Sequence, residues 1–250
     1  MDLLIAINRY LHILVGFAGL AAWWVPILTT KGGRLHQRMG KAFVFAAYVI
    51  GTTALVSLAL RITEARWAGA SWGTLLPELG FLLLLAYLGL FTVSAAHFGV
   101  RILRTRRQPH TLRTPGLEVL SWLLMAGSVI VVAHALIFWT PTSIILLLLS
   151  PIGITQGLEQ RRYARQQPAL KRPWFYAHMD AMLGAGIAFH TAFLVFGSRV
   201  VFDLSILGPF NWVPWVLPAI VGTVFGNRWK KIYMRRFGDL PPDGKAIAVS

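Results

Sequence analysis

Residues 77–113 read PELGFLLLLAYLGLFTVSAAHFGVRILRTRRQPHTLR, and this stretch carries the pattern that decides the fold. Nearly every side chain from 77 to 100 is apolar or small, and a helix needs about 20 such residues to cross a bilayer. Residues 101–113 then hold five arginines and no acidic residue. An apolar run that ends in a basic loop is typical of a transmembrane helix whose loop stays in the cytoplasm.

The same pattern recurs along the chain and predicts an all-α, polytopic membrane bundle of about seven transmembrane helices. The chain has 250 residues, is 56% hydrophobic and only 13% charged, and has a mean hydropathy of +0.62. Soluble domains carry about 25% charged residues. We expect a single membrane domain over 1–238 and a disordered cytoplasmic tail over 239–250. The expected spans are 3–29, 42–60, 77–100, 117–139, 141–158, 175–197 and 212–227.

The basic residues predict the orientation of these spans. The formal net charge is +15, which in a soluble protein would favour a nucleic-acid partner. However, 20 of the 24 Lys and Arg lie in segments that fall on one side of the membrane if the spans alternate in direction. The pattern therefore places the N-terminus outside and the C-terminus in the cytoplasm, in a bacterial cytoplasmic (inner) membrane. It makes the lipid bilayer the partner and disfavours nucleic acid. The four basic segments are 31–41, 101–113, 159–173 and 227–250.

The chain has no cysteine, which excludes disulfides, thiolate zinc sites, iron–sulfur clusters and covalently attached haem. Any metal ion or cofactor would be held by His, carboxylate, Met or backbone groups. The sequence contains no nucleophile–base pair and no HExxH motif, so it singles out no catalytic residue.

Histidine is the most informative residue type, because an ionisable side chain inside a membrane span is costly and marks a functional site by default. Measured by depth along the spans, His12, His134 and His190 form an outer layer. His97 and His178 form an inner layer, together with His36 on the first cytoplasmic loop near the same surface. Imidazoles that face each other from different helices are what a membrane-embedded haem b requires.

His178 and His190 lie on one predicted helix, roughly 18 Å apart along its axis at the standard rise. This separation is similar to the iron-to-iron spacing of dihaem membrane cytochromes. The two rings are also some 120° apart around the helix, so each would need different neighbours.

Two further polar groupings stand out, the second of which belongs to an alternative interpretation as a metal or proton site. On the first span, Asn8, His12, Gly16 and Gly19 share one stripe, which we expect to face the interior of the bundle. At the cytoplasmic end, His36, His178 and Asp180 could form an entrance that binds protons or a divalent metal ion.

Two stretches of the chain resemble a known family. LHILVGFAGLAAWWVPILTTKGGRLHQRMGKAFVFAAYVIG resembles the opening of a family of predicted bacterial membrane proteins known only as a domain of unknown function. HMDAMLGAGIAFHTAFLVFG, followed by WVLPAIVGT, resembles the closing part of the same family. The resemblance covers roughly the first 60 and the last 80 residues, and it implies no activity. It makes His12, His36 and His178 family-type positions, whereas His97, His134 and His190 look like additions of this sequence.

Three functions are consistent with these observations. The leading hypothesis is a b-type haem redox protein that moves electrons, with a quinone or a partner subunit, through an outer and an inner haem. The second is a transporter or channel for a metal ion, protons or a small solute, lined by His and Asp180. The third is a non-catalytic membrane subunit or assembly factor in which the histidines only tie helices together.

Overall fold

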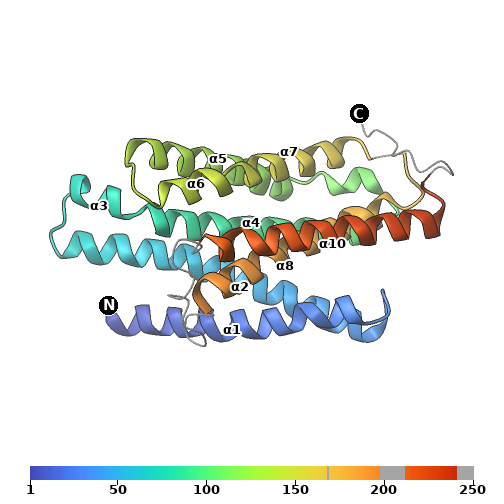
Figure 1. Cartoon of the computed structure of the whole chain (residues 1–250), viewed down its shortest axis with the longest axis horizontal. Coiled ribbons are helices and arrows are strands. Elements are labelled where there is room, and N and C mark those ends of the chain that lie inside the picture. The colour runs from blue at the N-terminus through green and yellow to red at the C-terminus, as the bar shows by residue number, and fades with distance from the viewer. Residues whose placement is uncertain (168, 198–211, 241–250) are drawn as a thin grey trace. The chain divides into compact units, whose positions relative to one another are not determined.

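The computed structural model describes residues 1–167, 169–197 and 212–240, and every regular element within them is helical (Figure 1). The all-α prediction is confirmed, and six helical segments are long and apolar enough to cross a membrane. The elements are α1 (Asp2–Leu28), α2 (Arg34–Trp67), α3 (Trp72–Glu78), α4 (Gly80–Thr105), η1 (Pro109–Leu112), α5 (Pro115–Ile137), α6 (Ser143–Leu149), α7 (Pro151–Arg165), α8 (Pro173–Ala192), η2 (Phe193–Gly197) and α10 (Val213–Phe237).

The six apolar segments match six of the expected spans: α1, α2, α4, α5, α6 with α7, and α8 with η2. The seventh expected span, 212–227, corresponds to the N-terminal half of α10, whose C-terminal half is strongly basic. The expected external loop at 198–211 lies outside the described residues. Of the expected disordered tail, the structure describes only residues 239 and 240.

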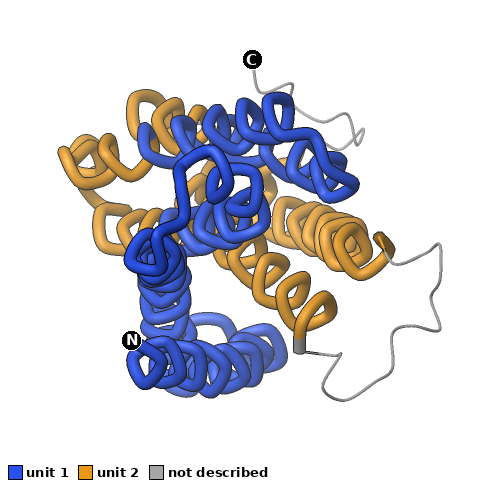
Figure 2. The backbone as a smooth tube through the Cα atoms, turned by 90° about the vertical axis from the view of Figure 1, so that its left-hand side faces the viewer, with its two compact units in different colours: residues 1–94, 122–157 blue, residues 95–121, 158–250 orange. Residues whose placement is uncertain are grey.

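The chain divides into two compact units (Figure 2). Unit 1 comprises residues 1–94 and 122–157, and unit 2 comprises residues 95–121 and 158–250. Helices α4, α5 and α7 each contribute residues to both units.

In unit 1, α1 and α2 form a helical hairpin and lie side by side (Figure 1). The turn between them uses Gly32 at φ +79°, a backbone conformation that glycine adopts without steric cost. Lys31 Nζ donates to the carbonyls of Pro26 and Ile27, at 2.8 and 2.7 Å. These carbonyls belong to the last turn of α1, where no backbone N–H follows to bond them. The hairpin is therefore closed by a lysine that bonds to the end of a helix.

The surface of α1 has the composition of a lipid-facing helix. Leu3 and Leu14 are 72% and 69% exposed, and most large side chains of α1 outside its polar stripe are apolar and exposed. A soluble helix of this length would carry polar residues on its outer face. An apolar exposed face indicates contact with acyl chains, which agrees with the membrane interpretation.

Helices α2 and α4 approach closely at a pair of glycines in unit 1. A Cβ atom on Gly51 would lie 2.9 Å from the carbonyl oxygen of Gly89 and 2.3 Å from Val93 Cγ2. Small residues at such contacts let membrane helices pack backbone against backbone.

Unit 1 also contains the break between α6 and α7, at Pro151. Proline has no N–H to donate to the carbonyl of residue 147, and Ser150 Oγ donates to that carbonyl instead, at 3.2 Å. The carbonyl of Ser150 accepts from Tyr87 Oη at 2.8 Å and from Ser128 Oγ at 2.7 Å. The N–H of Gly153 donates to Tyr87 Oη at 2.6 Å. The broken backbone is thus bonded to side chains of α4 and α5, as a membrane interior requires.

Unit 2 is built around an apolar cluster of Phe98, Ile102, Leu112 and Leu117. Within this unit α8 packs on α10 through glycine. A Cβ on Gly222 would lie 2.4 Å from Ile187 Cγ1, and one on Gly226 would lie 3.0 Å from Leu183 Cδ1. This close packing sets the neighbours of the polar residues that α8 carries.

Candidate functional site

His12, on α1 of unit 1, bonds to α2. Its Nδ1 lies 2.7 Å from Thr53 Oγ1. Because the Thr53 hydroxyl donates its own proton to the carbonyl of Val49, at 2.7 Å, it accepts from His12 Nδ1–H. Asn8 donates to the carbonyl of Thr53 and to Ser57 Oγ, at 3.0 and 2.8 Å. The polar stripe of the first span therefore faces α2, as the sequence predicts.

His134, on α5 of unit 1, bonds to α3 and packs against the start of α4. It is 8% exposed, and its Nε2–H donates to the carbonyl of Leu76 at 2.8 Å. A Cβ on Gly80 would lie 2.6 Å from Cε1 and 3.0 Å from Nδ1 of this ring. One nitrogen of His134 thus bonds to the backbone of α3, and the other lies against Gly80 at the start of α4.

The two histidines of α8, in unit 2, share one tautomer. Nδ1 of His178 bonds to the carbonyl of Gly99 at 2.9 Å, and Nδ1 of His190 bonds to the carbonyl of Gly186 at 2.7 Å. A carbonyl can only accept, so each neutral ring carries its proton on Nδ1 and its lone pair on Nε2. This is the arrangement that second-shell carbonyls give to metal-ligating histidines.

His97 lies on a different face of α4 from the one that contacts α8. A Cβ on Gly99 would lie 3.2 Å from Ala181 Cβ, so Gly99 faces α8. His97, two positions earlier, is rotated by about 160° from Gly99 at the usual turn per residue. It shares its face with Arg101 and Arg104, whose charges act on it. His178 of α8 therefore lies against the Gly99 face of α4, whereas His97 lies on another face of α4.

The remaining histidine sets are divided between the units. In the outer layer, His12 and His134 belong to unit 1 and His190 to unit 2. In the alternative metal set, His36 belongs to unit 1 and bonds to the carbonyl of Pro26 at 3.2 Å, whereas His178 and Asp180 belong to unit 2. Across the described residues, no group of three or more His, Asp or Glu side chains could hold a metal ion.

A different set of ionisable residues does come together in unit 2, and we call it the charge site: Glu159 of α7, Asp180 of α8 and Lys230 of α10. Lys230 Nζ donates to Asp180 Oδ2 and forms an ion pair with it. Both charges also act on the carboxylate of Glu159. Each residue lies roughly 10 Å from the basic end of its helix at the standard rise, so the three are at similar depth.

The charge site is unusual in this chain because acids are scarce. The sequence has nine Asp and Glu against 24 Lys and Arg, yet two of the acids lie near one lysine here, and Asp180 is paired with it. Fully ionised, the three side chains leave one net negative charge. That excess favours uptake of a proton or another cation.

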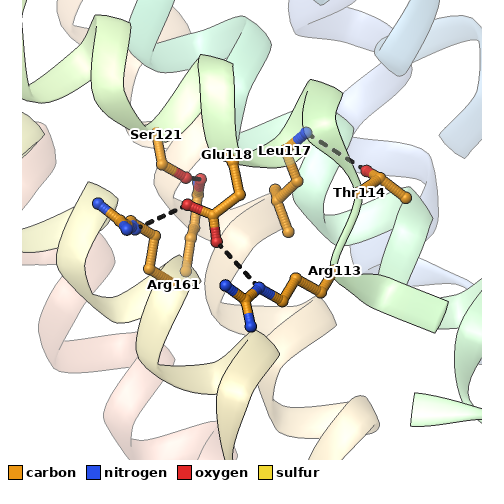
Figure 3. Close-up of polar contacts among 7 residues, drawn as sticks. Arg113, Thr114, Leu117, Glu118, Ser121 and Arg161 are labelled. Carbon is orange, nitrogen blue, oxygen red and sulfur yellow. Dashed lines mark hydrogen bonds and ion pairs between the residues drawn. The ribbon is translucent and has the colours of Figure 1, made fainter. Parts of the chain in front are cut away.

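A second ionic contact in unit 2 is shown in Figure 3. Glu118 lies between two arginines, with Oε2 3.0 Å from Arg161 Nε and Oε1 3.6 Å from Arg113 Nε. Glu118 stands in the first turn of α5, where Thr114 Oγ1 accepts from the N–H of Leu117 at 3.3 Å. A carboxylate at this end of a helix is also stabilised by the helix dipole. The positive excess here marks Glu118 as a structural anchor for α7.

The end of α10 is fixed to the start of α8. Gly238 has φ +68°, and the N–H groups of Gly238 and Asp239 bond back to the carbonyls of Arg235 and Met234, which is a Schellman motif. Asp239 is buried, and its carboxylate accepts from Tyr176 Oη and from the N–H of Lys171, both at 2.6 Å.

Sequence reasoning found Asp180 but missed Lys230 and the role of Asp239. The expected seventh span stops at residue 227, whereas α10 continues to Phe237. Hydropathy therefore placed Lys230 in a cytoplasmic tail. The sequence did contain a hint. The cations in 228–236 are spaced as on a helix, and this spacing places Lys230 on a different face from the neighbouring cations.

Comparisons with known proteins returned no match: no family model, no curated protein and no solved structure matches the chain. The function is therefore argued from the site itself.

Proposed function

We propose that the chain crosses the bacterial cytoplasmic membrane seven times, with its N-terminus outside and its C-terminus in the cytoplasm, and conducts a proton or another small cation. The observation that carries this proposal is the charge site, where Glu159, Asp180 and Lys230 meet from three helices. The three side chains lie at or near the cytoplasmic ends of the expected spans, where ionisable groups would form the entrance to an ion or proton pathway. The basic segments support the orientation, and α10 is the seventh span.

The ion pair supplies a way to bind and release the cation. With Asp180 paired to Lys230, the carboxylate of Glu159 carries the excess negative charge of the site. A proton or cation that binds Glu159 neutralises this excess, and protonation of Asp180 would release Lys230. By taking up and releasing one positive charge, the site would alternate between zero net charge and one net negative charge.

A flux assay in proteoliposomes tests this function. Vesicles with a pH-sensitive dye inside are given a potassium diffusion potential, and proton entry is followed with and without competing Na⁺ or K⁺. We expect Asp180→Asn and Glu159→Gln to reduce the flux at least about tenfold, since each removes a cation-binding carboxylate. Glu64→Gln is the matched control, because Glu64 pairs with Arg61 in unit 1.

Two results would contradict the proposal. One is a wild-type flux equal to that of protein-free vesicles for protons and for the competing cations. The other is an Asp180→Asn variant that is folded, by its melting temperature, and as active as Glu64→Gln.

A b-type haem protein that serves a quinone or a redox partner subunit is the second candidate. The tautomer of His178 and His190 supports it, because Nε2 is the nitrogen that would bind iron. The fit is incomplete, since His134 is engaged by Leu76 and His97 lies on another face of α4. Sharp α and β bands in the dithionite-reduced spectrum of the purified protein would establish this candidate.

Membership of the family of predicted membrane proteins that the two terminal stretches resemble is likewise a proposal. If neither flux nor haem bands are found, the third function, a non-catalytic membrane subunit or assembly factor, is the one that accounts for the bonding of His12 and His134.

A further inference from the structure

One face of α10 changes from apolar to cationic along its length. Leu217, Val221 and Val224 are 44–45% exposed, and Arg228, Lys231 and Arg235 are exposed as well. At about 100° per residue all six positions fall within a sector of roughly 80° around the helix. We call this face the α10 stripe. Its three cations extend over roughly 10 Å of the axis, beginning where the apolar part ends.

Lys230 marks the opposite side of the helix. It follows Trp229 and precedes Lys231, and its ammonium is paired with Asp180 of α8. The cations of the α10 stripe differ from it, because no carboxylate among residues 1–167, 169–197 and 212–240 forms an ion pair with any of them. Three neighbouring positive charges are therefore left facing outward.

We propose that the α10 stripe is a docking surface for an anionic phospholipid of the cytoplasmic leaflet. The apolar half would lie against the acyl chains, and the guanidinium and ammonium groups would bond to the headgroup phosphate. The order of the residues supports a lipid over a soluble partner, because the apolar and cationic parts are continuous on one face. Guanidinium groups suit phosphate oxygens, and basic residues near the membrane surface bind anionic lipids.

This inference rests on the proposed placement of α10 as the seventh span, which can be tested separately. The chain has no cysteine, so a single Cys at position 221 or 231 can be labelled without background. We expect a water-soluble maleimide, applied to sealed inside-out vesicles, to modify the Cys at 231 and not the Cys at 221. Equal modification of both would show that α10 lies outside the bilayer.

Binding is then measured in nanodiscs of phosphatidylcholine with added phosphatidylglycerol, by counting retained phosphatidylglycerol with native mass spectrometry. Each lost cation is worth roughly fivefold in affinity. We expect Lys231→Gln to weaken retention about fivefold, and R228Q/K231Q/R235Q to weaken it by at least about tenfold. Lys230→Gln is the matched control: it removes the same charge from the adjacent residue and should retain the lipid within about twofold.

Charge-preserving changes and the flux assay complete the test. R228K/K231R/R235K should keep most of the binding, which separates lost charge from a folding defect. The proposal is overturned if the triple Gln variant retains phosphatidylglycerol like the wild type, or if Lys230→Gln and Lys231→Gln lose it equally. Either result concerns lipid retention alone, and the charge site is judged by the flux of Asp180→Asn and Glu159→Gln in phosphatidylcholine vesicles.

Discussion

In unit 1 the polar side chains within the helices bond mainly to hydroxyls and backbone carbonyls, whereas in unit 2 several of them bond to opposite charges. Tyr87, Ser128 and His134 are typical of unit 1. The pairs Asp180–Lys230 and Glu118–Arg161 are typical of unit 2. Unit 1 does hold the exposed ion pair Arg61–Glu64, but its Lys31 bonds to two carbonyls.

This difference separates groups that serve the fold from groups that are candidates for function. A neutral hydrogen bond stabilises a folded protein by about 1 kcal/mol, and a buried backbone group that lacks one is costly. Such bonds are therefore explained by the fold alone. The Asp180–Lys230 pair is partly exposed, with side chains that are 48% and 33% exposed, and such ion pairs contribute about 0–1 kcal/mol to stability. Charges retained in unit 2 therefore favour a functional explanation there.

The largest expected effect is a loss of stability at the helix break of unit 1. In Gly153→Ala the new Cβ would lie 2.5 Å from Ser128 Oγ and 2.6 Å from Tyr87 Oη, both on fixed neighbouring helices. We expect a loss of about 3 kcal/mol in the free energy of unfolding, measured by denaturant titration in detergent, from overpacking alone.

Gly116→Ala is the control for this loss, since a Cβ at Gly116 meets no atom within 4 Å. It should be neutral or stabilising by up to about 1 kcal/mol, as alanine favours a helix. Equal losses in both variants would show that the helix break in unit 1 is not tightly packed.

The next largest effect is expected at the Glu118–Arg161 ion pair of unit 2. Glu118→Gln leaves Arg161, whose side chain is only 15% exposed, without its carboxylate. We expect a loss of about 2 kcal/mol, less than for a fully buried pair because Glu118 is partly exposed. A double-mutant cycle with Arg161→Gln measures the pair itself. A coupling energy near zero would show that Glu118 and Arg161 do not stabilise unit 2 as a pair.

A smaller effect is expected at the centre of the helix break. Tyr87→Phe removes the hydroxyl that accepts from Gly153 and donates to Ser150, but Ser128 still donates to the Ser150 carbonyl. The buried N–H of Gly153 keeps only its longer bond to the Ser150 carbonyl, at 3.3 Å, so we expect a loss of about 1.5 kcal/mol. Tyr10→Phe, at an exposed tyrosine of α1, should be close to neutral. A neutral Tyr87→Phe would mean that water replaces the hydroxyl.

The smallest effect concerns Lys31, outside the spans. Burial lowers the pKa of Lys31 from its ordinary value of 10.5. The folded chain therefore releases this proton at a lower pH than the unfolded chain, and stability should rise slightly as pH increases toward 10.5. Lys31→Arg, which keeps its charge, should lose that rise. The measurement is the pH dependence of the melting temperature, and identical slopes would contradict the prediction.

The sequence predicted most of the helices because hydropathy and helix length are local properties. It predicted the inward stripe of α1 for the same reason, since Asn8 and His12 are one turn apart. It misjudged where helices end: α2 runs from Arg34 to Trp67, beyond the apolar span of 42–60, because its polar ends still favour a helix. Hydropathy locates the bilayer and not the helix boundary.

The candidate site was harder to predict because it depends on rotation about each helix and on the partners that packing supplies. Depth along the spans places His97 and His178 in one layer. Only the packing of α8 on Gly99 shows that His178 contacts one face of α4 while His97 lies on another. Asp180 was identified as a costly charge, whereas its pairing with Lys230, 50 positions later, is a tertiary contact that no local pattern contains.

The break at Pro151 has a consequence for the order in which the chain assembles. The seven residues of α6 are too few to cross a bilayer alone, so they enter the membrane together with α7. At the break their exposed carbonyl and N–H need Tyr87 and Ser128, which belong to earlier segments of the chain. During synthesis from the N-terminus, α4 and α5 are therefore already in the bilayer when the broken segment arrives. Its hydrogen-bond partners are in place before it inserts.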